Sequence, residues 1–230
     1  MKKLLIAASL FTIVLVGCKK DPDSGSTVVT VSQPTISFSG GKFYSINTGG
    51  SLPSVSATAY DSLLGESYPV SIVGTEALDN STPGLYIVSA TAKNKYGFIT
   101  NENVYVAVTD IPESRDISGS YKRVDVATGQ ASIVTKLARG LYQLDNLGGV
   151  PRTGPTARPD LMFPVLFVQI NDSLLNIPEQ STPVGVIQVA DENGVENQAI
   201  LRRSPGDTSY RYAIISGGSF GTAVRKFQKQ

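Results

Sequence analysis

The sequence predicts an all-β protein with two domains in tandem: a β-sandwich, then a second antiparallel β-sandwich or barrel. Two observations predict this fold class. The chain contains 22 glycines and 13 prolines together with many Ser, Thr and Val, which favours short strands joined by turns over helices. Apolar residues also alternate with polar ones in several short stretches, with the period of two that is typical of half-buried strands.

Residues 1–17 are predicted to be a signal peptide. Lys2 and Lys3 give it a positive start, and an apolar run then extends from residue 4 to residue 16. The run is shorter than the ~20 residues of a membrane-spanning helix and has the length of a secretory signal. It ends in Leu15-Val16-Gly17-Cys18, which resembles a bacterial lipobox. The resemblance implies cleavage after Gly17, a diacylglyceryl thioether on Cys18 and acylation of the new amino terminus.

Cys18 is the only cysteine of the chain, so an internal disulfide is excluded. An ordinary signal peptide with an accidental cysteine is the alternative. Two or three acyl chains bind a bilayer stably, whereas one chain binds reversibly. The sequence therefore predicts a membrane partner, contacted through lipid on Cys18.

Residues 18–30 are predicted to be a flexible lipid tether, because residues 19–27 are polar and contain Pro22 and Gly25. Acidic residues at positions 21 and 23 are similar to the surface-export signal of Bacteroidota lipoproteins, although Pro22 interrupts the acidic pair. We therefore expect anchoring in the outer membrane with display on the cell surface. The periplasmic face is the alternative.

Residues 31–110 are predicted to form the first sandwich. Val55, Ala57 and Ala59 alternate with polar residues, and a Pro83-Gly84 turn precedes a strand over 85–93. Residues 94–97 reverse the chain before a strand that ends in the valines of 104–108. The run 79–92, with Gly97 and Val104-Tyr105-Val106, resembles bacterial immunoglobulin-like domains. The resemblance implies an immunoglobulin-like fold and no activity.

Residues 110–118 are polar and contain a proline, so a domain boundary is expected there. Residues 117–230 are predicted to form the second domain, with strands over 131–137, 161–170 and 210–215 and a hairpin turning at Asn193-Gly194. The runs 117–123 and 140–149 resemble the C-terminal β-domain of two-domain Bacteroidota outer-membrane lipoproteins, whose members have no established activity.

Charge and composition exclude several functions. Without Lys2 and Lys3, 18 basic residues remain against 19 acidic ones, and this balance argues against nucleic-acid binding. The chain has no His and one Cys, which excludes the usual zinc sites. Residues 191–193 are too sparse in carboxylates for a calcium loop. We therefore expect neither a metal nor a cofactor.

The run Gly217-Gly218-Ser219-Phe220-Gly221 matches the nucleophile elbow of serine hydrolases. That motif needs a histidine to accept the serine proton, and this chain has none. The run is therefore interpreted as a glycine-rich turn before the last strand. Sequence leaves open a pair of glycosidase carboxylates, but small β-domains without Trp seldom form the required cleft. We expect a protein that is not an enzyme.

A long loop over residues 146–159 is the candidate ligand loop. Arg152 and Arg158 can bind carboxylates, including those of acidic sugars. A solvated loop without a ligand is the alternative. Tyrosines can stack on sugars if exposed or pack in the core if buried, and the relevant ones are Tyr142, Tyr210 and Tyr212.

Two short motifs, Asp61-Ser62-Leu63 and Asp172-Ser173-Leu174, match the Bacteroidota pattern for O-glycosylation of exported proteins. Ser62 and Ser173 are therefore the candidate acceptors. The function expected from the whole sequence is a non-catalytic binding module on the envelope, with polysaccharide as the leading ligand. The alternative is a structural or adhesion component that contacts other envelope proteins.

Overall fold

The computed structural model describes residues 32–52, 54–204, 206–217 and 220–230. The predicted signal peptide, Cys18 and nearly all of the tether lie outside these residues. Residues Gln33–Gln230 form one compact unit, and the proposed boundary near residues 110–117 stays a prediction. The described residues contain strands and short 3-10 turns but no α-helix, which confirms the all-β class. No helix of the described chain has the length and apolarity to cross a membrane.

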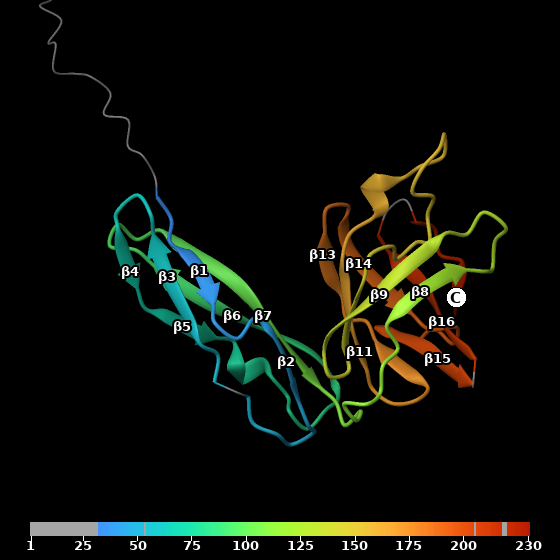
Figure 1. The fold of residues 1–230 in the computed structure, drawn as a ribbon, viewed down its shortest axis with the longest axis horizontal. Helices are drawn as coiled ribbons and strands as arrows, with labels where there is room; N and C mark the ends of the chain where they lie inside the picture. The colour runs from blue at the N-terminus through green and yellow to red at the C-terminus, as the bar shows by residue number, and fades with distance from the viewer. Residues whose placement is uncertain (1–31, 53, 205, 218–219) are drawn as a thin grey trace, which may run out of the picture. The chain divides into compact units, whose positions relative to one another are not determined.

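Two facing sheets are built from residues 35–108 (Figure 1). The first has the order β1-β3-β4, with bounds Thr35–Phe38, Ala57–Asp61 and Glu66–Tyr68. The second has the order β2-β7-β6-β5, with bounds Phe43–Ile46, Ile99–Val108, Gly84–Lys93 and Val70–Val73. The predicted turns at Pro83-Gly84 and at residues 94–97 therefore begin and end β6 as expected.

The core between these sheets consists of the inward residues of each strand. Val88, Ala90 and Ala92 of β6 are buried together with Val104 of β7, and Ile36 and Ala59 meet them from the opposite sheet. The buried residues of β6 therefore recur with the period of two that is typical of a half-buried strand.

The immunoglobulin-like order of this sandwich is not confirmed. In immunoglobulin folds, strands A and B lie in one sheet, and strand B is followed by strand C in the opposite sheet. Here β3 turns back directly as β4 within its own sheet, with Tyr60 opposite Ser67. The sequence similarity to immunoglobulin-like domains is confined to the region of β6 and β7. It predicts that these two strands pair, but it does not determine how the other strands are connected.

Residues 119–229 contain a closed antiparallel barrel, which decides between the two predicted alternatives for this region. Among the described residues, eight strands close the ring in the order β8-β9-β10-β11-β12-β15-β16-β17. Their bounds are Gly119–Arg123, Ala131–Ala138, Leu141–Leu144, Val165–Gln169, Leu174–Asn176, Gln198–Ser204, Asp207–Ser216 and Val224–Lys229. A hairpin of β13 (Gln180–Thr182) and β14 (Gly185–Ala190) is inserted between β12 and β15 and extends the sheet from β16.

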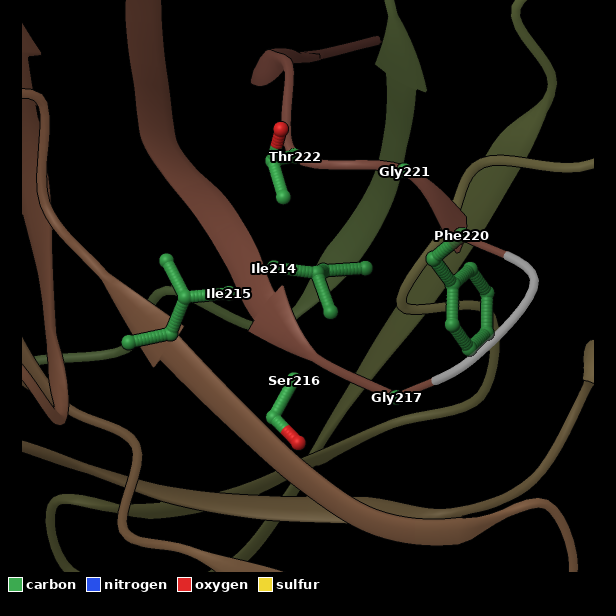
Figure 2. A pocket seen from close by; sticks show the side chains of 7 residues that line it. All are labelled: Ile214, Ile215, Ser216, Gly217, Phe220, Gly221 and Thr222. Atoms are coloured by element: carbon green, nitrogen blue, oxygen red, sulfur yellow. The ribbon is translucent and has the colours of Figure 1, made fainter.

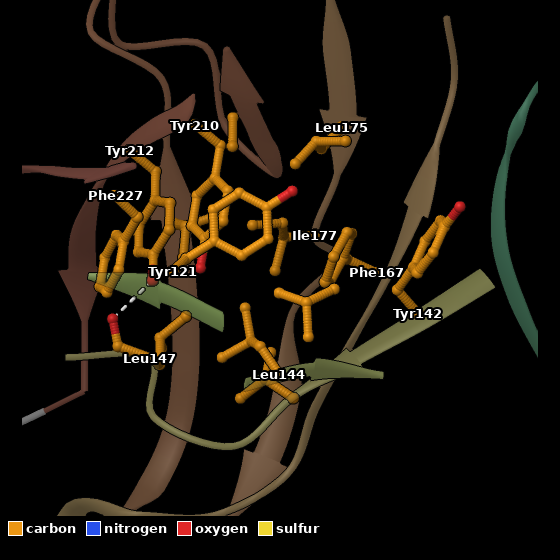
Figure 3. Close-up of a cluster of buried hydrophobic side chains, with 14 of the residues drawn as sticks. Tyr121, Tyr142, Leu144, Leu147, Phe167, Leu175, Ile177, Tyr210, Tyr212 and Phe227 are labelled. Atoms are coloured by element: carbon orange, nitrogen blue, oxygen red, sulfur yellow. Dashed lines mark hydrogen bonds between the residues drawn. The ribbon is translucent and has the colours of Figure 1, made fainter. Parts of the chain in front are cut away.

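The barrel interior is filled by aromatic rings (Figure 3). The ring centroids of Tyr210 and Phe227 lie 5.1 Å apart in a stacked arrangement, and those of Tyr121 and Tyr210 lie 4.9 Å apart. Tyr142 stacks on Phe167 at 5.5 Å. Such contacts combine a large buried apolar area with favourable ring geometry, so this cluster is the main source of barrel packing.

Buried phenols also fix chain segments that have no strand structure. The Tyr121 hydroxyl donates to the Ile117 carbonyl at 2.6 Å, and the Tyr142 hydroxyl lies 3.3 Å from the Arg115 carbonyl. The Tyr212 hydroxyl donates to the Leu147 carbonyl at 2.5 Å (Figure 3). The predicted polar hinge at 110–118 is therefore bound to the barrel, with Ile117 buried.

Two predicted elements differ from the structure. The strand expected over 161–170 begins only at Val165, because residues 159–161 form a 3-10 turn and Pro164 lacks a donor for a ladder. The hairpin expected at Asn193-Gly194 is only partly correct. The chain does reverse there, but β14 and β15 separate after the isolated bridge between Ala190 and Glu196, and each pairs with a different part of β16.

The outer face of the barrel packs on the outer face of the β2-β7-β6-β5 sheet. Leu85 and Ala107 contact Leu141, Leu166 and Val168 in one buried cluster. This contact explains why every residue of β11 is buried: Leu166 and Val168 point outward, whereas Val165 and Phe167 belong to the interior cluster.

Hydrogen bonds accompany this apolar contact. The Thr109 hydroxyl donates to the Gln169 carbonyl at 2.7 Å, and Arg139 donates to the Ile111 carbonyl at 2.9 Å. The Leu85 N–H donates to Asn176 Oδ1 at 3.1 Å. The sandwich and the barrel are thus joined by both packing and directed polar contacts.

We predict that Tyr212→Phe destabilises the fold by about 1–3 kcal/mol, because it leaves the buried Leu147 carbonyl without its phenol donor. Tyr210→Phe is the matched control, since in the described chain no backbone carbonyl accepts the buried Tyr210 hydroxyl, whose polar neighbour is the Ser132 side chain. Urea unfolding followed by circular dichroism measures both variants. Equal losses of stability in the two variants would contradict the assignment.

Alkaline pH is predicted to unfold the barrel. Burial raises the pKa of Tyr121, Tyr142, Tyr210 and Tyr212 above the ordinary value of 10.0. The folded protein therefore keeps protons that the unfolded chain loses, so this stabilisation is complete below pH 10.0 and declines as the pH rises further.

Tyrosinate absorbance and circular dichroism should be recorded together during the alkaline titration. We expect the absorbance of these four phenols to appear only with the loss of β-structure. Complete ionisation of all tyrosines in a folded barrel would show that the phenols are accessible to solvent.

Candidate functional site

The glycine-rich run that matches a nucleophile elbow lies at a small hollow beside the end of β16. Figure 2 shows this hollow, which has a volume of ≈ 250 Å³ and is lined by Ile214, Ile215, Ser216, Gly217, Phe220, Gly221 and Thr222. Ser219 lies outside the described residues. Phe220 packs edge-on against Phe163 at 6.1 Å, and Arg225 donates to the carbonyls of Phe220 and Gly221. The described part of the run thus forms a fixed connection to β17.

The candidate ligand loop is less open than its sequence indicates. Asn146 is buried, and its amide donates to the carbonyls of Ala131 at 3.1 Å and Val150 at 3.0 Å. Residues 146–149 are buried, so they do not belong to an uncovered loop. The prediction of an uncovered loop is therefore wrong for residues 146–149. The Asn146 side chain supplies hydrogen bonds to the backbone that strand pairing would otherwise provide.

The two arginines of this loop are exposed and bind neighbouring carboxylates. Arg152 lies 2.8 Å from Asp145, and Arg158 lies 2.7 Å from Asp160. The hydrogen bonds to Arg158 lower the pKa of Asp160, and those to Asp160 raise the pKa of Arg158. Each guanidinium therefore has a carboxylate partner from its own surroundings, and their binding of a ligand stays a prediction.

The three tyrosines considered for sugar stacking are core residues. Tyr142 and Tyr212 are 0% exposed and Tyr210 is 2% exposed. Their rings line the closed barrel interior and cannot reach a ligand in solvent. Of the two interpretations of these tyrosines, packing in the core is therefore the correct one.

A larger groove lies between the outer face of the second sheet and the barrel. It has a volume of ≈ 560 Å³, within the range typical of small-molecule sites. The sheet contributes Lys42, Phe43, Ile87, Asn103 and Tyr105. The barrel side contributes Gln143, Phe163, Pro164, Leu166, Glu179, Gln180, Ser181, Thr182 and Pro183.

An aromatic pair forms one wall of this groove. Phe43 and Tyr105 are directly opposite each other on the parallel strands β2 and β7, and their rings stack at 5.5 Å with an interplanar angle of 17°. Both side chains are half-buried, so part of each ring faces the groove. The wall is a preformed apolar surface held by two strands.

Polar groups surround the aromatic pair. The Asn103 amide lies 3.4 Å from the Tyr105 hydroxyl, and Lys42 forms an ion pair with Glu102 at 3.3 Å. Gln180 is held by two hydrogen bonds to the backbone of Leu166, at 2.9 and 2.8 Å. The groove therefore combines an apolar surface with positioned amides, an ammonium and the exposed carboxylate of Glu179.

The sequence prediction missed this groove, although one signal for it exists. In Val104-Tyr105-Val106 the valines face the sandwich core, so the period of two directs Tyr105 to the opposite face. Its partner Phe43 comes from a strand about 60 residues earlier in the chain, and only the parallel pairing of β2 with β7 brings the two rings together.

The structure places both candidate acceptor serines in exposed turns. Ser62 follows the buried Asp61, whose carboxylate accepts the N–H groups of Leu63 and Leu64 at 3.2 Å. The Ser173 hydroxyl donates to Asn171 at 2.9 Å. Exposure in a turn is the property that O-glycosylation requires, so both residues remain candidates.

Metal-binding side chains do not gather at these places. In the described ranges, no group of three or more Asp, Glu, His or Cys residues has the arrangement of a metal site.

Comparison with known proteins adds little to this geometry. No protein-family model matches the chain, and no curated protein matches it. The chain is similar to a lipoprotein from Bacteroides thetaiotaomicron of known crystal structure, with a TM-score of 0.38 and 17% identity. That similarity covers 86% of this chain and 100% of the other. At such values the likeness carries no argument about function. We therefore infer the function from the groove alone.

We predict that the exported protein carries glycan on Ser62 or Ser173. The intact mass should exceed that of the acylated polypeptide, and Ser62→Ala or Ser173→Ala should remove the excess. A mass equal to that of the bare diacylated or triacylated chain would contradict this prediction.

Proposed function

We propose that this protein is a lipid-anchored envelope protein that binds polysaccharide without transforming it. The observation that supports the proposal is the stacked Phe43–Tyr105 pair on the wall of the groove. This site replaces the 146–159 loop as our leading ligand site, because the arginines of that loop are bound to their own carboxylates.

The chemistry of the groove suits a sugar chain. A pyranose ring has apolar C–H faces that pack on aromatic rings, and equatorial hydroxyls that need donors and acceptors at its edge. Phe43 and Tyr105 offer the apolar surface, while Asn103, Gln143 and Glu179 offer the polar groups. An openly accessible groove also admits a section of a longer polymer.

The lining of the groove supports binding without hydrolysis. Glycoside hydrolases generally use two carboxyl groups about 5–9.5 Å apart on either side of the scissile bond. Among the described residues that line the groove, Glu179 is the one carboxylate. This distribution of charge favours a binding protein over a glycosidase.

The proposed anchor is lipid on Cys18, with the protein in the outer membrane and displayed on the cell surface. Gln33, where the compact unit begins, is fifteen positions after Cys18. At no more than ~3.6 Å per residue, this segment spans at most about 54 Å. The groove therefore remains close to the envelope, where polysaccharide is encountered.

We predict that Phe43→Ala and Tyr105→Ala each weaken polysaccharide binding by about tenfold or more, because each removes one ring of the apolar wall. Affinity electrophoresis of the protein from residue 19 onward, with a series of soluble polysaccharides in the gel, measures the effect. Tyr60→Ala is the matched control, since Tyr60 is an exposed aromatic residue of the other sheet.

Thermal unfolding of each variant should be recorded beside the electrophoresis, so that loss of folding is distinguished from loss of binding. Unchanged migration of the wild-type protein in every polysaccharide gel would contradict the proposal. Retention of a specific envelope protein in that case would favour the structural or adhesion role, in which the sandwich is a spacer.

A further inference from the structure

Large apolar side chains are exposed at one end of the sandwich. Leu63 is 58% exposed and Tyr96 is 66% exposed, and both lie in turns at this end. Tyr60 at 51% and Ile99 at 48% flank them on the two sheets. We call these four residues the sandwich tip.

Hydrogen bonds and an ion pair hold the two turns of the sandwich tip together. The Asn94 amide donates to the buried Asp61 carboxylate at 3.1 Å, which joins the β6–β7 turn to the β3–β4 turn. Lys95 and Glu66 form an ion pair across the same turns at 2.6 Å. The sandwich tip is therefore one built surface, although its residues come from two distant stretches of the chain.

The compact unit begins beside the sandwich tip. In the ladder between β1 and β3, Thr35 is opposite Tyr60 and Phe38 is opposite Ala57, so β1 starts at the tip end. At the other end of the sandwich, β6 begins at Gly84 opposite Val108, where the chain leaves for the barrel. The segment that leads back to Cys18 thus joins the fold at the sandwich tip.

The chemistry of the tip suits the headgroup layer of a bilayer. Tyrosine rings have an apolar body and a polar hydroxyl, and they are enriched where membranes meet water. Leu63 and Ile99 gain free energy when apolar surface leaves water. The Lys95–Glu66 pair keeps opposite charges matched at the same end, which limits the cost of approaching lipid.

We propose that the sandwich tip rests in the headgroup layer of the membrane that holds the lipid anchor. The proposal rests on the anchoring part of the proposed function and is independent of the groove. Contact at the sandwich tip would orient the sandwich away from the bilayer and restrict the range of positions that a tether alone allows.

The test uses the protein from residue 19 onward with an N-terminal hexahistidine tag, captured on phosphatidylcholine vesicles that contain a nickel-chelating lipid. Since the chain has no histidine and its only cysteine is removed, both the tag and an introduced thiol are unique. An environment-sensitive fluorophore is attached to Leu63→Cys and, as the matched control, to Val195→Cys, a residue between β14 and β15 that is 45% exposed.

We expect lipids with spin-labelled headgroups to quench the fluorophore at residue 63, and to leave the one at residue 195 unquenched. The double variant Leu63→Ser and Tyr96→Ser should lower binding of the untagged protein to the same vesicles by about tenfold. Equal quenching at residues 63 and 195 would overturn the proposal. Protection of residue 63 in a dimer formed without vesicles would also overturn it, because the tip would then bind a second copy.

Tag capture separates this test from the test of anchoring. Palmitate labelling of the full chain reports whether Cys18 is acylated. Quenching on nickel-bearing vesicles reports contact between the sandwich tip and the membrane, whether or not Cys18 is acylated. Failure of one therefore does not imply failure of the other.

Discussion

Closure of the barrel by its last strand is the constraint on which the rest of the structure depends. β17 pairs with β16 on one side and with β8 on the other, so that Phe227 is opposite both Tyr210 and Arg123. Without this double pairing β8 and β16 would each expose an unpaired edge, and open edges promote association between chains. Closure also creates an interior that side chains must fill, which the stacked tyrosines and phenylalanines do.

Closure also determines what the outer surface can do. Because the interior is occupied by aromatic rings, a ligand has access only to the outside of the barrel and to the sheets beside it. The outward residues Leu166 and Val168 pack against Leu85 and Ala107, and this contact fixes the second sheet next to the barrel. The groove lies along the same contact, so its walls are positioned by the packing that joins the two bodies.

The aromatic residues thus divide into two groups with different roles. Those of the barrel interior supply packing, and their hydroxyls hold the segments around Ile117 and Leu147. Phe43 and Tyr105 instead lie on the outer face of a sheet, where their stacked rings form one wall of the groove. Residue type alone does not separate these groups, since Tyr105 and Tyr212 both stand in alternating strand patterns.

The sequence by itself determined the all-β class, because alternation and turn residues act over a few positions. Pro83-Gly84, the reversal at 94–97 and the buried valines of β7 were all visible locally. The absence of histidine likewise led to the prediction that residues 217–221 are a glycine-rich turn and not a serine-hydrolase motif.

Only the tertiary structure decided which strands are neighbours. β8 meets β17 about 100 residues later, and this pairing made a barrel rather than a second sandwich. The parallel pairing of β2 with β7 formed the aromatic wall, and the contact between two turns formed the sandwich tip. The physical reason is that a period of two shows which side of a strand is buried, while partner and register depend on the summed packing of the whole chain.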